Sequence, residues 1–265
     1  MAAIRKPGMI LIDVDGTLVD SVPDLAFCVD AMMERLGKSP RGEAAVRDWV
    51  GNGVERLVRR ALTGSLDGEP DEADFERAYP VFLDLYADNT SKRSCLYPGV
   101  REVIDMLKAA GYPLGCVTNK AAQFTGPLLK DLGVAEEFAI IISGDTLPQK
   151  KPHPAPLLHA AEFFGIAPEA SLMIGDSVSD VKAARAAGFQ IVCMSYGYNH
   201  GVDIRDSSPD AVIDSMTELQ GLLEDADELT LEPAVAAIPT ITPIGMAALM
   251  PGADASFSVV AKGAT

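Results

Sequence analysis

Residues 9–17 read MILIDVDGT, and this stretch decides the expected fold. Its first four residues are apolar, a run short enough for a strand that is buried on both faces of a sheet. Two carboxylates, Asp13 and Asp15, follow directly. Open sheets of parallel strands bind ligands outside the carboxyl ends of their strands. The stretch therefore predicts a buried strand that brings acidic side chains to a ligand-binding crevice.

Four further apolar runs have the length and residue types of buried strands. Between them lie segments with apolar residues at three- and four-residue spacing, the pattern of helices that cover a sheet. Three of these segments are followed by glycine, the usual helix stop. The alternation predicts an α/β fold, a parallel sheet with helices on both faces. The expected strands are residues 113–117, 138–142, 172–174 and 190–194, and the expected helices are residues 100–110, 123–132, 156–164 and 178–187.

The interval between residues 22 and 95 differs, because it holds no strand-like run. It contains helical stretches around residues 25–36, 54–62 and 75–86, separated by glycine and proline. Because it leaves the sheet after the first strand and returns before the second, we expect a small helical lid hinged near Asp20 and Leu96. The expected domains are an α/β core of residues 1–20 and 97–226, a helical insertion of residues 21–96, and a flexible tail of residues 227–265.

The tail is expected to be flexible because of its composition. From residue 233 to residue 265 only Asp254 and Lys262 are charged, and four prolines interrupt any helix. The alternative is an apolar strip that docks on the core or on a partner.

Charge and composition exclude several classes of protein. The chain has 265 residues, of which 48% are hydrophobic and 23% charged, as in ordinary globular proteins. Its net charge of −16 repels phosphate backbones and anionic lipids, so no nucleic-acid or membrane partner is expected. The apolar run before Asp13 is too short for a signal peptide, and no run reaches the roughly 20 residues of a membrane span. Four scattered cysteines without CxxC spacing indicate reduced thiols, and hence a cytoplasmic protein.

Polar side chains also follow the other expected strands. Seen alone, each has an ordinary explanation as a helix cap, a solvated lysine or an acidic first helical turn. Together with Asp13 and Asp15 they would meet at one edge of the sheet, which predicts a site. They are Thr118, Asn119 and Lys120 after the second strand, Lys151 in the segment KKPHP after the third strand, and Asp176 and Asp180 after the fourth strand.

The chemistry of this set indicates a metal and a phosphoryl group. Clustered carboxylates raise one another's pKa unless a cation holds them, and oxygen-only ligands favour Mg²⁺ over zinc. A lysine, a hydroxyl and backbone N–H groups beside that metal would surround an anion. The expected partner is therefore a small-molecule phosphate ester, whereas the sequence carries no indication of oligomeric state.

The segments DVDGTLVDS, VTNK, KKPHP and GDSVSD, in this order, resemble the four signature motifs of the haloacid dehalogenase superfamily. The resemblance covers residues 9 to about 223 and implies a Rossmann-like core with an all-helical cap. WVGNGVERLVRRAL, KPHPAPLL and YGYNHG are similar to the phosphoglycolate phosphatase branch. The dehalogenases themselves lack the second aspartate of the first motif. Because Asp15 is present here, the resemblance implies a phosphohydrolase.

The resemblance also implies roles for the motif residues. Asp13 would be the nucleophile that forms an aspartyl phosphate, and Asp15 would be the general acid and base. Mg²⁺ would be held by Asp13, Asp176 and the backbone carbonyl of Asp15, with Asp180 in or next to its coordination shell. The groups expected to bind the substrate's phosphoryl end are Thr118, Asn119 and Lys151, with Gly16 and Thr17 in the adjoining loop.

Substrate selection would fall to the helical insertion, because the core contacts only the phosphoryl group. Gly51-Asn52-Gly53 opens a helix that carries Arg56, so Asn52, Gly53 and Arg56 are expected to receive a carboxylate, although a solvated helix with a glycine start would look the same. The expected function is Mg²⁺-dependent hydrolysis of 2-phosphoglycolate to glycolate and phosphate. The alternatives are another capped phosphatase, a pyrophosphatase or phosphomutase, and, more remotely, a non-catalytic phosphate sensor.

Overall fold

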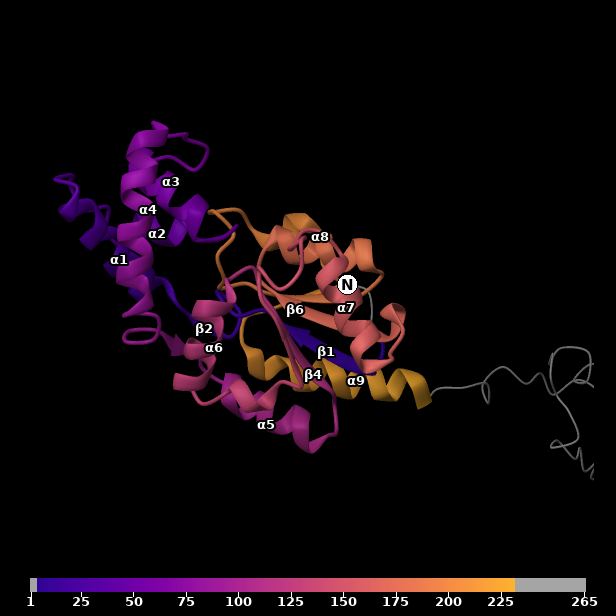
Figure 1. The fold of residues 1–265 in the computed structure, drawn as a ribbon. Coiled ribbons are helices and arrows are strands. Elements are labelled where there is room, and N and C mark those ends of the chain that lie inside the picture. Colours follow the sequence, from indigo (N-terminus) through magenta and orange to yellow (C-terminus); the bar gives the residue numbers. More distant parts are fainter. Residues whose placement is uncertain (1–3, 232–265) are drawn as a thin grey trace, which may run out of the picture.

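Strand β1 (Met9–Ile12) lies in the middle of a six-stranded sheet in the computed structural model, which describes residues 4–231 (Figure 1). The strand order is β5-β4-β1-β6-β7-β8, and every neighbouring pair is parallel. No side chain of β1 is more than 1% exposed. Because both faces of the sheet are covered, the strand needs no alternation of apolar and polar residues.

The remaining strands of the sheet follow the predicted order along the chain. All five expected strands are present, and β1 and β7 have the expected bounds. The short edge strand β8 was not predicted, because three residues give no readable pattern. The bounds are β4 (Leu114–Val117), β5 (Ile140–Ile142), β6 (Ser171–Gly175), β7 (Gln190–Met194) and β8 (Ala211–Ile213).

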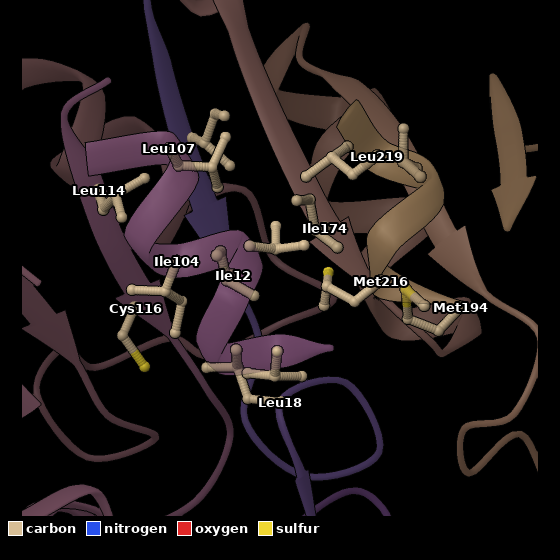
Figure 2. Close-up of a cluster of buried hydrophobic side chains, with 14 of the residues drawn as sticks. Ile12, Leu18, Ile104, Leu107, Leu114, Cys116, Ile174, Met194, Met216 and Leu219 are labelled. Carbon is tan, nitrogen blue, oxygen red and sulfur yellow. The ribbon is translucent and has the colours of Figure 1, made fainter. Parts of the chain in front are cut away.

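Helices form a layer on each face of the sheet, as the α/β pattern predicts. Strands alternate their side chains between the two layers, so that Ile10 and Ile12 join one apolar cluster and Met9 and Leu11 the other. Figure 2 shows the first cluster, where Ile12 lies close to Ile104 and Leu107. The first layer contains α5 (Val100–Ala109), α6 (Ala122–Asp131) and α9 (Leu219–Leu231), and the second contains α7 (Ala155–Phe164) and α8 (Val178–Ala187).

Helix α9 bears on the expected tail. It continues to Leu231, so the helix includes residues 227–231 of the expected tail. The rest of the expected tail, residues 232–265, lies outside the described residues.

Four helices form the helical insertion between β1 and β4, and they pack around an apolar cluster of their own. Both connections to the core run through a two-stranded antiparallel pair, β2 (Val19–Asp20) and β3 (Cys95–Leu96), in which Val19 faces Leu96. Figure 1 shows the insertion standing beyond the edge of the main sheet. The short helix α2 was not predicted, because its buried side chains are Val46 and Trp49 alone. The helices are α1 (Val22–Arg35), α2 (Glu43–Trp49), α3 (Val54–Thr63) and α4 (Glu72–Ala87).

Among the described residues, no helix has the length and apolar character that a membrane span requires.

Candidate active site

The carboxyl ends of the central strands meet at the edge of the sheet that faces the helical insertion. Strand β1 lies between β4 and β6. The chain continues from β4 to β5 on one side of β1 and from β6 to β7 and β8 on the other, so the strand order changes direction at β1. Such a reversal opens a crevice outside the strand ends. Asp13 and Asp15 follow β1, Thr118 follows β4, and Asp176 follows β6. One pocket is lined by these four residues together with Lys151.

Lys151 joins two of the carboxylates. Its Nζ lies 3.0 Å from Oδ2 of Asp13 and 2.7 Å from Oδ1 of Asp180, and it donates to the carbonyl oxygen of Val117 at 2.8 Å. Only 2% of the residue is exposed. Burial by itself would lower the pKa of Lys151, but Asp13 and Asp180 raise it above its ordinary value. Lys151 is therefore a fixed positive charge beside the end of β1.

Asp176 is held by neighbours from two different loops. Thr17 Oγ1 donates to its Oδ1 at 2.7 Å, and the backbone N–H of Tyr198 donates to its Oδ2 at 2.6 Å. A Cβ added at Gly16 would lie 2.3 Å from Asp176 Oδ2, and Gly16 has a φ of +83°. The first-motif turn therefore requires glycine at this position, both for its conformation and for the approach of Asp176.

Three buried carboxylates form a group that fits a divalent cation. Asp13, Asp176 and Asp180 each offer an oxygen, and these oxygens lie within 4.8 Å of one another. When all three are ionised, Lys151 balances one charge and two negative charges remain. Burial raises the pKa of Asp13 to about 7, and burial with Asp180 and Asp13 raises the pKa of Asp176 well above its ordinary value. An oxygen-only, electron-rich set of this kind suits Mg²⁺.

Asp180 serves the helix as well as this group. Its Oδ2 accepts from the N–H of Ser177 at 3.0 Å and from Ser177 Oγ at 2.6 Å. The first of these bonds, with the bond from the Asp180 N–H to the Ser177 side chain, forms the capping box of α8. Burial alone would raise the pKa of Asp180, but the contact with Lys151 and the hydrogen bonds from Ser177 hold it below its ordinary value. The residue is thus fixed at the edge of the carboxylate group.

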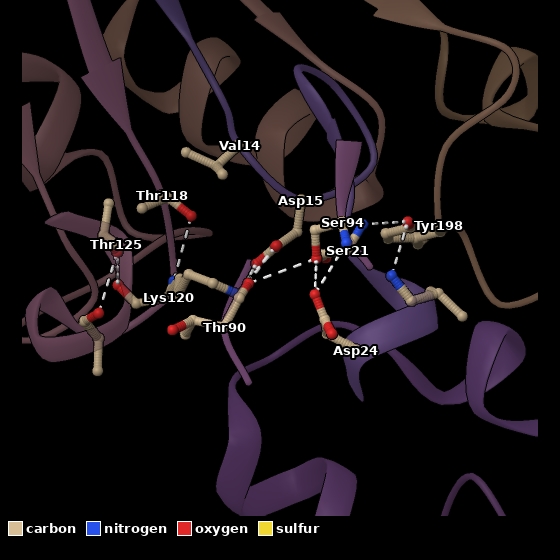
Figure 3. A network of polar contacts seen from close by, with 12 residues as sticks. Val14, Asp15, Ser21, Asp24, Thr90, Ser94, Thr118, Lys120, Thr125 and Tyr198 are labelled. Carbon is tan, nitrogen blue, oxygen red and sulfur yellow. Dashed lines mark hydrogen bonds and ion pairs between the residues drawn. The ribbon is translucent and has the colours of Figure 1, made fainter. Parts of the chain in front are cut away.

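Asp15 turns to a different cation. Both of its oxygens lie 2.9 Å from Nζ of Lys120, which is 4% exposed (Figure 3). Lys120 was expected at this edge of the sheet, but the sequence analysis gave it no role. The two aspartates of the first motif therefore have separate lysine partners, Lys151 for Asp13 and Lys120 for Asp15.

The helical insertion supplies the opposite wall of the pocket. The expected residues Asn52 and Gly53 line it together with Thr118 and Asn119 of the core, and its volume is about 80 Å³. Gly51, Asn52 and Gly53 have φ values of 124°, 66° and 94°. Three successive residues in this region need glycine or asparagine, which explains the sequence Gly-Asn-Gly before α3.

Contacts across the pocket join this loop to the core. Lys150 Nζ donates to the carbonyl oxygen of Asn52 at 3.2 Å, and Nδ1 of His200 lies 2.8 Å from the carbonyl oxygen of Asp48. Both Lys150 and His200 were left without a role by the sequence. The core loops that carry them therefore hold the insertion over the pocket.

Arg56 does not line the pocket, whereas Arg60, to which the sequence analysis gave no role, contacts the loop. Arg56 donates to Glu69 and to the carbonyl oxygen of Leu66, and it lines a second, outer cavity rather than the pocket. Arg60, 6% exposed, donates to Asn52 Oδ1 at 3.0 Å and to the carbonyl oxygens of Trp49 and Gly51 at 2.6 and 3.2 Å. Residue 60 lies one turn further from the loop than residue 56, and because helical side chains point toward the helix N-terminus, the Arg60 side chain reaches back to the loop. Arg60 therefore braces the loop that Arg56 was expected to serve.

Comparison with known families gives a match over most of the described chain. A profile of the haloacid dehalogenase-like hydrolases matches residues 8–188. A phosphoglycolate phosphatase of Nitrosococcus oceani is 70% identical over 223 residues, which are 84% of this chain and 99% of that protein. A phosphoglycolate phosphatase of Pseudomonas putida is 48% identical over 227 residues, covering 85% of this chain and 83% of that protein.

Solved structures give the same picture of the fold. The crystal structure of a predicted phosphoglycolate phosphatase from Haemophilus somnus superposes with a TM-score of 0.75 at 35% sequence identity, covering 87% of this chain and all of that one. The similarity therefore includes the helical insertion as well as the sheet.

Proposed function

The chain belongs to the haloacid dehalogenase-like hydrolases and is a phosphatase, and from that premise we propose that it hydrolyses 2-phosphoglycolate with Mg²⁺ through a phosphorylated Asp13. The observation that carries the proposal is the convergence of Asp13, Asp15, Thr118 and Lys151 on one pocket. Two relatives named phosphoglycolate phosphatase support the substrate.

In the first step, an Asp13 oxygen attacks phosphorus. The new O–P bond forms as the bond from phosphorus to the glycolate oxygen breaks, and its electron pair stays on that oxygen. Asp15, as the acid, gives the leaving oxygen a proton. Lys151, the Thr118 hydroxyl and the Asn119 side chain lie where they can bind the oxygens of the transferred group.

In the second step, a water molecule attacks the phosphorylated Asp13. The water oxygen bonds to phosphorus, the P–O bond to Asp13 breaks with its electron pair on the carboxylate, and Asp15 takes the proton of the water. Splitting the reaction in this way replaces one difficult displacement by two easier ones. Inorganic phosphate then leaves, and both aspartates are restored.

The group of Asp13, Asp176 and Asp180, with the backbone carbonyl of Asp15, would hold the metal. Mg²⁺ bound there would neutralise the negative charge of the phosphoryl group beside the carboxylates. The residues themselves fix the positions: Thr17 and Tyr198 orient Asp176, and Ser177 orients Asp180.

We propose that the helical insertion, residues 21–96, is a cap that selects the substrate. The pocket lies between the core and the Gly51–Gly53 loop, and the first N–H groups of α3 follow that loop. A helix N-terminus attracts an anion, so it suits the carboxylate of phosphoglycolate. The small volume of the pocket agrees with a two-carbon substrate.

The place of action stays a proposal. Three of the four cysteines are buried free thiols, which supports a reducing compartment, and we propose the cytoplasm.

The covalent step can be tested directly. Rapid mixing with phosphoglycolate and Mg²⁺, acid quenching and mass spectrometry of the peptides should place one phosphoryl group on Asp13. If the Asp13→Asn variant releases phosphate and no phosphopeptide is trapped, water attacks phosphorus directly and the covalent step is wrong.

A further inference from the structure

Lys120 lies beside the general acid and base, outside the groups that bind the phosphoryl oxygens or the metal. Its ammonium contacts both Asp15 oxygens at the same distance, 2.9 Å, so the carboxylate is held at two points (Figure 3). The two contacts hold the carboxylate end of the Asp15 side chain close to the ammonium.

The backbone of Lys120 is itself fixed on both sides. Its N–H donates to Thr118 Oγ1 at 3.2 Å, and its carbonyl oxygen accepts from the N–H of Gly144 at 2.8 Å and from Thr125 Oγ1 at 3.2 Å. The side chain therefore leaves from a rigid turn at the end of β4. A rigid origin lets a long, flexible side chain act as a defined support.

The far side of the ammonium is closed by the helical insertion. The Lys120 Nζ lies 5.1 Å from the ring centroid of Tyr86 on α4, within the range of a cation–π contact. Tyr86 is fully buried, and its ring lies 4.7 Å from that of Phe124 on α6. Lys120 is thus enclosed between the core and the insertion, and its position depends on both.

We propose that Lys120 is a positioning residue, which holds the Asp15 carboxylate where it can take the proton of the water that attacks phosphorylated Asp13. This inference rests on the proposed function. Lys120 gains and loses no proton in the step; the proton passes from water to Asp15, and the bond from phosphorus to Asp13 breaks. A displacement of about 1 Å in such a group can cost roughly 100-fold in rate.

Lys120→Met tests the proposal, because methionine has a similar length and no charge. The substrate is p-nitrophenyl phosphate, whose leaving group needs no proton, so formation of the aspartyl phosphate should be nearly spared. The second step should be slowed about 100-fold. Stopped-flow absorbance should then show a burst of one p-nitrophenolate per active site, followed by slow turnover. Lys120→Arg keeps the donors and should turn over within about tenfold of the parent.

The control is Lys130→Met, the same change at an exposed position of α6, which should behave as the parent. Parental turnover in Lys120→Met would overturn the proposal. So would an equal loss in both steps without a burst, since that pattern is expected of a merely structural residue. A parent enzyme that releases no phosphate from any ester would instead contradict the proposed function.

A second variant covers the case in which Lys120→Met does not fold, as judged by circular dichroism. Tyr86→Leu keeps the ion pair but removes the aromatic face beside the ammonium, and it should give the same burst with roughly tenfold slower turnover. Parental kinetics in a folded Tyr86→Leu variant would overturn the dependence of Lys120 on the insertion.

Discussion

At the scale of single residues, the site is organised by two lysines that each contact one aspartate of the first motif. Lys151 contacts Asp13 and Asp180, while Lys120 contacts Asp15. The proposed nucleophile, Asp13, and the proposed acid and base, Asp15, therefore lie in different electrostatic surroundings, although only two positions separate them in sequence. Such separation lets neighbouring carboxylates take different roles.

Asp13→Asn should lower kcat by roughly 1,000-fold or more, because the amide cannot form the phosphorylated intermediate. The fold should persist. Burial already raises the pKa of the Asp13 carboxyl, so the neutral amide removes a charge that burial disfavours. Phosphate release and thermal melting measure the two effects. Asp105→Asn, on the exposed side of α5, is the matched control and should keep parental kcat. Substantial turnover by Asp13→Asn would rule out covalent catalysis.

Removal of the metal should abolish activity, because the three carboxylates carry more charge than Lys151 balances. Phosphate release should cease in excess EDTA and return with Mg²⁺. Ca²⁺ should inhibit, since its larger and looser coordination misplaces the nucleophile. Full activity in EDTA would contradict this account of the carboxylate group.

The sequence predicted that most of these residues lie at one edge of the sheet and have a role there, but it predicted no role for Lys120. Asp13, Asp15 and Asp176 were readable because each follows an apolar strand directly. A lysine after a strand resembles a solvated residue, and its partner Asp15 lies 105 positions earlier. Its burial also depends on Tyr86 of α4, which is packed there only by the folded insertion.

At the scale of the elements, helix α3 and the loop before it form the part of the site that we propose selects the substrate. Arg60 donates from α3 to Trp49, Gly51 and Asn52, so the loop and the helix are one unit. The spacing of Arg56, Arg59 and Arg60 places three arginines on one side of α3. It does not tell which of them contacts the loop. Arg56 instead pairs with Glu69, a residue beyond the helix that the sequence could not place.

Arg60→Met should lower kcat/KM for phosphoglycolate about tenfold or more, because one hydrogen bond from a charged donor contributes roughly 1.5–3 kcal/mol. Ethyl phosphate has the same length but lacks the carboxylate, so its kcat/KM should change much less. Arg59→Met is a matched control on the same helix, where the guanidinium pairs with Glu72. An equal loss on both substrates would mean that Arg60 supports folding of the insertion rather than selection.

Gly53→Ala should show the same selectivity through a different cause. A Cβ there would lie 3.4 Å from Lys150 Nζ, which is ordinary contact, but the φ of +94° is strained for alanine. The loop should shift, so that kcat/KM for phosphoglycolate falls while turnover of p-nitrophenyl phosphate is nearly kept. Unchanged phosphoglycolate kinetics in this variant would remove the loop from substrate selection.

At the scale of the whole molecule, the sequence predicted the sheet better than the placement of the insertion on it. Apolar runs such as Met9–Ile12 identify buried strands locally, so a parallel sheet covered by helices followed from their alternation with helical segments. The arrangement of core and insertion depends on contacts between distant segments, such as Lys150 with Asn52 and Tyr86 with Phe124. These contacts have no periodic signature in the sequence.

Deletion of residues 233–265 should leave kcat/KM within a few-fold of the full chain. Leu219, Leu223 and Ala226, the side chains of α9 described as buried, precede the deletion, and the deleted segment is rich in proline and poor in charge. Steady-state kinetics and size-exclusion chromatography of the shortened chain provide the test. Unfolding or a changed oligomeric state would show that the segment has a structural role.

The measurement that tests the central claim most directly is kcat/KM for 2-phosphoglycolate beside a panel of small phosphate esters, all in Mg²⁺. The panel should include ethyl phosphate, hexose phosphates and pyrophosphate, which cover the alternative functions. We expect the highest kcat/KM for 2-phosphoglycolate, because Asp13 and the Gly51–Gly53 loop line the same pocket and 2-phosphoglycolate carries a carboxylate that this loop would bind. A higher value for any ester without that carboxylate would contradict the account.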